Sequence, residues 1–557
     1  MKYLVLAKTY EELEKESGKL KKVDILSNLL SKTPTEFLSK VVILASGKVF
    51  PAYSELTTGV ATKMMMKAIS KATGISQNEI VKNFKQSGDL GLVAEVCAKS
   101  KKQKIFFKKT LSIQLVFDNI QKLAILTGSG SQEKKLNLIA ELLVSSEPIE
   151  ARYIVRTILE TMRIGVAEGI IRDSIAKVFN VNAEAVENAW FLRADYGEIA
   201  KITKERGEAG LKKVEMELGK PIVIMLGEKS PTLKEALEKY EHPIIEYKYD
   251  GMRTQIHKKD DKLWIFTRRL ENVTNQFPDL LKLAKEGIKV KNCIIEGEAI
   301  GFDPKTGNPI PFQHLSRRIQ RKYDINIMVK KIPVRIYLFD IVYLNDKTLF
   351  DEPYSERRKK LEKSIKVIPN KFELSHSLIT KDLKKAEKFY KASLDENQEG
   401  LMVKNLDAKY QPGRRVGYWL KVKPVMETLE LVIVGAEWGK GKRSNWLSSF
   451  TLACRDPDTG DFLLVGKLGT GFTDEQFKEF TDKVKKLIIS EKGVELKIKP
   501  DFVVEVAYEE IQKSPKYESG YALRFPRLQK IREDRRPDDC DTVDRVIELF
   551  KSQGKAG

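Results

Sequence analysis

The spacing of apolar residues changes once along the chain, and this change divides the sequence into two kinds of structure. Up to about residue 215, apolar residues recur every three or four positions, as they do on one face of an α-helix. Ile154, Ile158, Met162 and Val166, for example, can share one helical face. Residues 210–232 contain five Gly and Pro residues, and short β-branched and aromatic runs follow. A helical region followed by sheet-containing domains is therefore expected.

The 557 residues are enough for about three or four domains. After the break, strand-like runs such as 292–302 and 334–344 alternate with Lys/Glu-rich helical segments, a pattern typical of an α/β domain built on antiparallel sheet. Farther on, strands are separated by glycine-rich turns, which favours a small β-barrel. We expect an all-α domain at 1–218, an α/β domain at 219–424 and an all-β domain at 425–557.

The chain is strongly basic, with 99 Lys and Arg against 78 Asp and Glu and a net charge of +21. A charge of this size favours a polyanionic partner, either nucleic acid or an anionic membrane surface, although a Lys-rich surface can also serve solubility alone. Within the helical region, Arg152, Arg156, Arg163 and Arg172 are expected to form a solvated face, and contact with phosphates is the alternative.

The cysteines at 97, 293, 454 and 540 are too dispersed for a zinc knuckle or a disulfide framework, which indicates a reducing compartment. No charge-free apolar run approaches the roughly 20 residues needed to cross a bilayer, and the N-terminal apolar stretch is short. We therefore expect a cytoplasmic, nucleoid-associated protein without a secretion signal or membrane anchor.

Two segments concentrate charged side chains on strand faces. In IIEYKYDGMR, residues 244–253, Glu246, Lys248 and Asp250 share one face. A lysine between two carboxylates can be a nucleophile, and an exposed salt-bridge ladder is an equally good interpretation. In GYWLKVK, Lys421 and Lys423 share a face, which suits either a bound anion or a solvated sheet edge.

Acidic residues also stand near predicted strand ends, at Glu296, Glu298 and Glu399. Such oxygen ligands suit Mg²⁺, which prefers one or two carboxylates together with water and substrate phosphates. A candidate nucleophile, phosphate-binding cations, metal-binding carboxylates and a basic surface together indicate metal-assisted phosphoryl or nucleotidyl transfer.

These motifs, in this order, resemble the ATP-dependent DNA ligases, specifically the archaeal type that is similar to eukaryotic replicative ligase. Upstream, GDLGLVAE at 88–95 and ETMRIGVAEG at 160–169 resemble the family's helical DNA-binding module. The segments that carry the rest of the resemblance are KYDGMR at 248–253, FTRRLENVTNQFPD at 266–279, IIEGEAIGFD at 294–303, PFQHLSRR at 311–318, YLFDIVYLN at 337–345, EGLMVK at 399–404, WLKVK at 419–423 and ALRFPRLQKIREDRRPDD at 522–539. The resemblance implies a helical DNA-binding domain, a nucleotidyltransferase domain and an OB-fold domain, within the boundaries given above.

The resemblance also implies a reaction in three steps, used in replication and repair. Lys248, as a neutral amine, would attack the α-phosphate of ATP and carry AMP. AMP would pass to the 5′-phosphate of a nick in duplex DNA, and the 3′-hydroxyl, oriented by Asp250, would then displace it. Two carboxylates, Glu298 and Glu399, would hold Mg²⁺, for which Mn²⁺ is a substitute, or the ribose hydroxyls of the nucleotide.

The implied ligands of the nucleotide come from several motifs. Glu246 would bind the adenine amino group, Arg253 the ribose side, and Phe339 the face of the base, although Phe339 could equally be a core residue. Arg268 would bind a phosphate, with Arg269 as the rival candidate. Asp340 is expected to order its turn rather than to ligate metal. The remaining implied nucleotide ligands are Lys248, Glu298, Arg415, Lys421 and Lys423.

The C-terminal motif implies a contact with the departing pyrophosphate, and it departs from the family pattern at one position. Its implied residues are Arg524, Arg527, Arg532, Asp534 and Arg535. Arg535 stands where the family usually has lysine, and the two cations are not equivalent in geometry. The linker PIVIMLGEKS also lacks the proline that commonly precedes Met-Leu in the family, which concerns only the linker's conformation.

The segment KKQKIFFKK resembles the truncated peptide by which archaeal ligases bind a sliding clamp of the PCNA type. Its contact residues would be Gln103, Ile105, Phe106 and Phe107. Paired aromatic residues framed by lysines favour an interface, and a surface loop that buries one aromatic ring is the alternative. We expect the enzyme to act as a monomer on nicked double-stranded DNA.

Two other classes of protein share part of this pattern. An mRNA-capping guanylyltransferase or an RNA ligase would share the lysine motif but not the long helical region. A non-enzymatic DNA-binding or clamp-associated protein would not need Lys248, Glu298, Glu399, Lys421 and Lys423 together. An NAD-dependent ligase is disfavoured because the cysteines supply no zinc module after the barrel.

Overall fold

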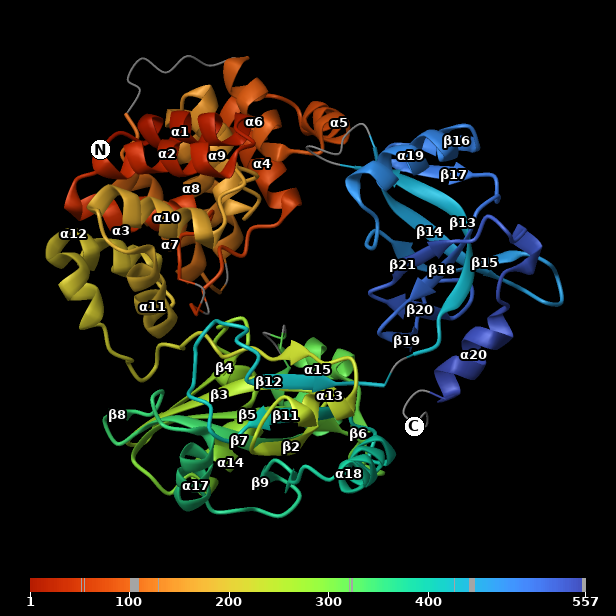
Figure 1. Cartoon of the computed structure of the whole chain (residues 1–557). Coiled ribbons are helices and arrows are strands. Elements are labelled where there is room, and N and C mark those ends of the chain that lie inside the picture. Colours follow the sequence, from red (N-terminus) through yellow and green to blue (C-terminus); the bar gives the residue numbers. More distant parts are fainter. Residues whose placement is uncertain are drawn as a thin grey trace. The chain divides into compact units, whose positions relative to one another are not determined.

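The computed structural model describes residues 1–51, 53–54, 56–100, 110–128, 130–319, 321, 324–424, 426–439 and 446–552 (Figure 1). Contacts within the chain divide it into two compact units. The first comprises Met1–Lys229, Glu238–Ile379 and Val403–Leu420, and the second comprises Ser230–Leu237, Thr380–Met402 and Lys421–Gly557. In the part of the chain that the structure describes, no helix is both long and apolar enough to cross a membrane.

The N-terminal region is helical, as its apolar spacing predicts. Several helices begin at a polar residue whose side chain accepts a backbone N–H of the first turn, as Ser76, Asp89, Ser112, Asn182 and Asp195 do. The helices pack around one apolar core to which α1, α9 and α10 all contribute. They are α1 (Tyr3–Lys15), α2 (Lys19–Ser31), α3 (Thr35–Ala45), α4 (Thr62–Thr73), α5 (Gln77–Ser87), α6 (Leu90–Lys99), α7 (Ile113–Ile125), α8 (Ser131–Ser145), α9 (Pro148–Ile158), α10 (Glu168–Phe179), α11 (Ala183–Arg193) and α12 (Tyr196–Lys212).

The central region is an α/β domain with two sheets. One sheet has the strand order β1-β12-β11-β2-β10, and the other has the order β4-β3-β5-β7-β8, with β6 beside β5 and β9 beside β7. The strands are β1 (Glu228–Lys229), β2 (Pro243–Lys248), β3 (Met252–Lys259), β4 (Lys262–Thr267), β5 (Asn292–Phe302), β6 (Pro309–Ile310), β7 (Val334–Leu344), β8 (Lys347–Thr348), β9 (Phe372–Leu374), β10 (Ser377–Ile379), β11 (Gly400–Asn405) and β12 (Trp419–Val422). The helices are α13 (Leu233–Glu238), the 3-10 helix η1 (Thr274–Gln276), α14 (Pro278–Gly287), α15 (Phe312–Ile319), α16 (Ile325–Lys331), α17 (Tyr354–Ser364) and α18 (Leu383–Asp395).

The pairing in the second sheet is antiparallel between β3 and β5 and between β5 and β7. Only β9 runs parallel to its neighbour β7 among the printed pairs of this sheet in the described residues. The antiparallel sheet matches the expectation from the alternating strand-like runs, and its apolar face packs with α14 and α17 around Phe277, Leu361 and Phe372.

The C-terminal region is a β-rich, OB-like domain. Its main sheet has the order β15-β14-β13-β17-β16, and β18 pairs with both β13 and β21. The core includes Leu431, Phe450 and Phe480. The elements are β13 (Leu429–Trp438), β14 (Leu447–Arg455), β15 (Phe462–Leu468), α19 (Asp474–Lys485), β16 (Ile488–Lys492), β17 (Glu495–Ile498), β18 (Val503–Ala507), β19 (Glu510–Lys513), β20 (Tyr521–Arg524), β21 (Arg527–Ile531), the 3-10 helix η3 (Pro537–Asp539) and α20 (Val543–Ser552). The predicted fold class, with all-α, α/β and all-β OB-type regions in this order, is confirmed.

Candidate active site

Lys248 is the last residue of β2 and is half-buried. The chain then turns at Gly251, where a Cβ atom would lie 2.5 Å from the carbonyl oxygen of Ala299. Only glycine permits this close approach of β3 to β5. Asp250 accepts a hydrogen bond from the backbone N–H of Phe312 (3.1 Å). The K-x-D-G pattern therefore makes a tight turn after the lysine, and its aspartate holds the start of α15.

Glu246 is buried two residues before Lys248 and is 1 % exposed. Its carboxylate accepts hydrogen bonds from Tyr354 Oη, from Ser375 Oγ (2.9 Å) and from Lys404 Nζ (2.8 Å). Burial alone would raise the pKa of Glu246, but Lys404 and Arg358 outweigh it and hold the pKa below its usual value. The alternative of an exposed salt-bridge ladder is therefore wrong for Glu246.

Phe339 lies among cations rather than in an all-apolar core. Arg253 stands 4.7 Å and Lys404 4.3 Å from the centre of its ring, and Trp419 meets it edge-on at 6.0 Å. Phe339 is 7 % exposed. Arg253 is also held by Glu296, at 2.8 Å. This arrangement presents an aromatic ring beside positive charge, which suits a nucleotide with its flat base and its phosphates.

Three arginines gather close enough to repel one another. The pKa of Arg268 is lowered first by partial burial and then by the charges of Arg253 and Arg415, while Glu298 opposes the shift. All three had been expected to bind nucleotide. Guanidinium groups that lie this close together favour an anionic ligand, and bidentate binding of phosphate is what guanidinium does well.

The carboxylates expected to bind metal are both half-buried. Glu298 lies on β5, paired with Arg253 of β3 and with Tyr337 of β7. Glu399 precedes β11, and its Oε2 lies 3.0 Å from Lys423 Nζ. The described residues contain no group of three or more His, Cys, Asp or Glu that could hold a metal ion. Each carboxylate by itself is a hard oxygen donor of the kind that suits Mg²⁺, which takes most of its ligands from water and substrate phosphates.

The residues of the C-terminal motif are held by carboxylates of the OB-like domain. Arg532 bonds both oxygens of Asp534 (2.9 and 2.7 Å) and also reaches Glu430, to which Arg535 pairs at 3.3 Å. Arg524 pairs with Glu510 at 3.2 Å, and Arg527 is exposed at the start of β21. The pKa of Asp534 is lowered chiefly by Arg532.

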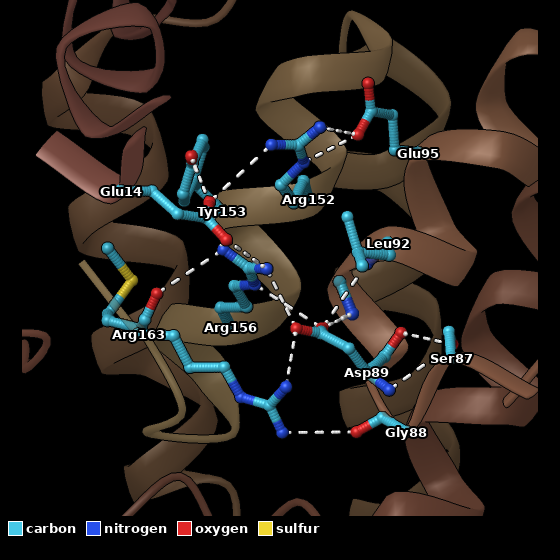
Figure 2. Close-up of polar contacts among 12 residues, drawn as sticks. Glu14, Ser87, Gly88, Asp89, Leu92, Glu95, Arg152, Tyr153, Arg156 and Arg163 are labelled. Atoms are coloured by element: carbon cyan, nitrogen blue, oxygen red, sulfur yellow. Dashed lines mark hydrogen bonds and ion pairs between the residues drawn. The ribbon is translucent and has the colours of Figure 1, made fainter. Parts of the chain in front are cut away.

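In the helical region, the two motifs that resemble a DNA-binding module meet (Figure 2). Asp89 begins α6 by accepting the N–H groups of Gly91 (2.8 Å) and Leu92 (3.3 Å). Arg163 reaches the same carboxylate at 3.2 Å and donates to the carbonyl of Gly88 at 3.2 Å. Arg163 has a left-handed backbone, with φ of 58°, a strained conformation for a non-glycine residue. The contacts with Asp89 and Gly88 hold this turn in place.

The expectation that four arginines form a solvated face is wrong for Arg156 and Arg152. Arg156 is 1 % exposed and pairs with Glu14 (2.7 Å) and Asp89 (2.8 Å). Arg152 bonds Glu95 and is 13 % exposed. Arg163, at 51 %, is the most exposed of the four. The physical reason is that buried carboxylates on other helices compensate the two inner guanidinium charges.

Several residues of the nucleotide region were not singled out from the sequence. Lys404 ends the EGLMVK motif, and Tyr354 and Tyr410 belong to no quoted motif, yet all three are buried beside predicted ligands. A lysine in an otherwise apolar strand was the available signal for Lys404. Asp340 is fully buried and paired in bidentate fashion with Arg357 (2.8 and 2.9 Å). The expected clamp-binding residues, Gln103, Ile105, Phe106 and Phe107, lie outside the described residues.

Comparison with known proteins gives matches along nearly the whole chain. Three family models match in order: DNA ligase N terminus at residues 2–176, ATP dependent DNA ligase domain at 224–423, and ATP dependent DNA ligase C terminal region at 443–535. The DNA ligase of Nanoarchaeum equitans is 46% identical over 99% of each chain. The DNA ligase of Archaeoglobus fulgidus is 42% identical, also over 99% of each chain. The solved structure of Pmar-Lig_PreS3 shares the fold, with a TM-score of 0.56 and 17% identity over 95% of this chain and 99% of that one.

Proposed function

The chain belongs to the ATP-dependent DNA ligases of archaeal type, and from this premise we propose that it seals nicks in duplex DNA through AMP carried on Lys248. A ligase of this class joins a 5′-phosphate to a 3′-hydroxyl and releases AMP and pyrophosphate. The observation that carries the assignment to this site is the set of cations around Phe339, because an aromatic ring beside Arg253 and Lys404 suits a nucleotide with its flat base and its phosphates.

In the first step Lys248 Nζ attacks the α-phosphate of ATP, and pyrophosphate leaves. Glu246, fixed by Tyr354 and Lys404, binds the adenine amino group, and Phe339 lies against the base. Arg253 binds the ribose side. Arg268, Arg415, Glu298, Lys421 and Lys423 complete the set of nucleotide ligands in this proposal. Their cations stabilise the charge that develops on the phosphate.

Glu298 and Glu399 are the proposed holders of Mg²⁺ or, as a substitute, Mn²⁺. Such an ion would supply neutralisation of phosphate charge during transfer. The pairing of Glu399 with Lys423 gives this carboxylate a fixed position from which its oxygens can act as ligands. Exchange of the metal ion, with rates measured in Mg²⁺, Mn²⁺ and chelator, tests this part of the proposal.

The later steps require DNA, which the basic chain is suited to bind through phosphates. In the second step AMP moves from Lys248 to the 5′-phosphate. In the third, Asp250 orients the 3′-hydroxyl, which displaces AMP. The helical domain at 1–218 grips the duplex around the nick, and the domains at 219–424 and 425–557 carry the nucleotide chemistry and the C-terminal motif. The enzyme works as a cytoplasmic monomer at the nucleoid.

Residues 103–107 are proposed to dock on a sliding clamp, with Phe106 and Phe107 as anchors. Replacing both by alanine should abolish clamp binding and clamp stimulation at moderate salt, because each hot-spot ring contributes roughly 2 kcal/mol or more. Self-adenylation and low-salt sealing should stay near normal. A variant that melts at a lower temperature and still binds the clamp would instead assign these rings to the core of the helical domain.

The deciding experiment for the nucleophile is incubation with α-labelled ATP and Mg²⁺, followed by denaturing electrophoresis. Wild type should retain label covalently. Lys248→Ala should not, and Lys248→Arg should fail too because guanidinium stays protonated. Lys262→Ala, an exposed lysine at the start of β4, is the matched control and should label normally. Label at wild-type level on Lys248→Ala would remove Lys248 from this role.

Parallel reactions with GTP and with nicked RNA distinguish an ATP-dependent DNA ligase from a capping enzyme or an RNA ligase.

A further inference from the structure

One carboxylate of the OB-like domain pairs with two arginines of the C-terminal motif. Glu430 lies on β13, outside the segments that resemble the ligase family. Its Oε1 accepts a hydrogen bond from Nη1 of Arg532, and its Oε2 lies 3.3 Å from Nε of Arg535. Each oxygen therefore contacts a different guanidinium group. Contacts between ionised groups are the strong ones, and with a planar guanidinium they also fix orientation.

Glu430 is itself held in place on both sides of its Cα atom. Its backbone N–H donates to Oδ2 of Asp541 (2.7 Å), and its carbonyl oxygen accepts the backbone N–H of Asp541 (2.7 Å). The motif is fixed to the same sheet, because the N–H of Arg532 donates to the carbonyl of Val503 at the start of β18 (2.8 Å). The N–H of Arg535 donates in turn to the carbonyl of Arg532 (3.2 Å). The carboxylate and the two guanidinium groups thus stand on one scaffold within one domain.

The two arginines differ in how much of the guanidinium remains open to an anion. Arg532 is 19 % exposed and also bonds Asp534 through Nε and Nη2, whereas Arg535 is 43 % exposed. Glu430 is 20 % exposed, so it supports Arg535 from the side of the sheet. A guanidinium that pairs through Nε still has two terminal nitrogens that can donate to a phosphate, whereas lysine has a single nitrogen. Arginine at position 535 can therefore be held by Glu430 and bind an anion at the same time.

We propose that Glu430 is a positioning residue for the charging of Lys248, because it holds Arg532 and Arg535 in the orientation in which they contact the departing pyrophosphate. This inference rests on the proposed function and adds to it a residue outside the C-terminal motif. Glu430 acts through the two arginines and only in the first step, since pyrophosphate leaves before AMP reaches DNA. The same contacts serve the reverse reaction. There a pyrophosphate oxygen attacks the phosphorus of the bound AMP, the P–N bond breaks, and ATP and the lysine amine, which takes up a proton, are restored.

The first test is Glu430→Gln, which keeps the size of the side chain and removes its charge. Charging at saturating ATP should slow about tenfold, and the KM for inorganic pyrophosphate in the reverse reaction should rise about tenfold, because the arginines remain but lose their fixed orientation. Sealing of a pre-adenylated nick should stay within about twofold of wild type. Glu505→Gln is the matched control, since Glu505 lies opposite Glu430 on β18 and bonds Thr428 (2.9 Å); it should behave as wild type in all three assays.

Two other results would each overturn the proposal. Faster charging or a lower KM for pyrophosphate in Glu430→Gln would mean that the carboxylate competes with pyrophosphate for the arginines. Equal losses in charging and sealing, together with a melting temperature below that of Glu505→Gln, would mean that Glu430 serves the fold of the barrel.

The second test asks whether Glu430 acts through the motif. Charging rates are measured for Glu430→Gln, for Arg535→Ala and for the double variant. Residues that act through one another are not additive, so the double variant should lose much less than the product of the two single losses. Single losses that multiply would overturn the proposal. Labelling with α-labelled ATP separates this inference from the proposed function. A wild type that never retains label contradicts the proposed function, whereas a wild type and a Glu430→Gln variant that label at the same rate overturn this inference alone.

Discussion

Lys404 Nζ lies 2.8 Å from Glu246 Oε2 in the interior, where the two side chains are 3 % and 2 % exposed. Burial lowers the pKa of Lys404, and the charge of Glu246 opposes that shift. Lys404 also lies 4.3 Å from the centre of the Phe339 ring, so one side chain links the stability of the domain to the proposed recognition of adenine.

We predict that Lys404→Met destabilises the domain by about 3–5 kcal/mol, since it removes the cation that is hydrogen-bonded to a buried carboxylate and leaves only Arg358, at 4.0 Å. Differential scanning calorimetry should show the loss. The double variant Lys404→Met with Glu246→Leu should recover part of it, because the buried carboxylate is removed together with its hydrogen-bonded cation. Equal melting temperatures for the single variant and wild type would contradict the role assigned to this pair.

A second prediction concerns acid stability. Burial lowers the pKa of His257 from 6.5 to about 3, so the imidazole stays neutral in the folded protein while the unfolded chain takes up a proton below about pH 6.5. The unfolded state then binds more protons, and stability falls as pH falls between these two pKa values. Between pH 8 and pH 5.5 this group should cost about 1.4 kcal/mol.

His257→Gln should therefore lose less stability than wild type over that pH interval, as measured by denaturant unfolding at each pH. Glutamine can still accept the hydrogen bond that the Gly219 N–H gives to His257 Nδ1. His314→Gln, an exposed histidine on α15, is the control. Parallel pH curves for wild type and His257→Gln would contradict the prediction.

A third prediction separates two arginines of the helical domain. Arg156→Met should destabilise that domain by about 3–5 kcal/mol, because Glu14 and Asp89 lose a buried partner. Arg163→Ala should change stability by less than about 1 kcal/mol, as its pairing is half-exposed. If Arg163 contacts a phosphate, its removal should weaken DNA binding and reduce the salt slope of the affinity by about one.

Arg172→Ala removes the same charge elsewhere in the domain, where Asp173 and Glu187 hold it, and serves as the control for net charge. Affinity for nicked duplex is measured by fluorescence anisotropy over a range of salt. Identical slopes for Arg163→Ala and Arg172→Ala would mean that Arg163 only stabilises its turn.

Local sequence pattern predicted the three fold classes and the strand that carries Lys248, because apolar spacing and turn residues act over a few positions. It could not predict partners that meet across long chain separations. Glu246 and Lys404 are 158 residues apart, and Arg156 and Glu14 are 142 apart. Judged from the sequence, the charge of Arg152 and Arg156 in α9 predicts exposure to solvent. Their burial depends on Glu14 of α1, on Asp89 at the start of α6 and on Glu95 of α6.

The last prediction concerns the C-terminal motif, whose proposed role is to orient pyrophosphate only while Lys248 is charged. Removing everything after Leu523 would delete β21, which pairs with β18, and so would damage the barrel as well as the motif.

Point substitutions test the motif without this damage, since Arg532 and Asp534 lie after β21. Arg532→Ala and Asp534→Ala should each slow self-adenylation by about 100-fold, the usual effect of losing one charge contact at a reacting centre. Sealing of a pre-adenylated nick should stay within a few-fold of wild type, because pyrophosphate takes no part in it. Asp538→Ala, an exposed carboxylate of η3, should behave as wild type in both assays. Equal losses in charging and sealing would show instead that the motif supports DNA binding or the fold of the barrel, and the melting temperature of each variant would tell these two apart.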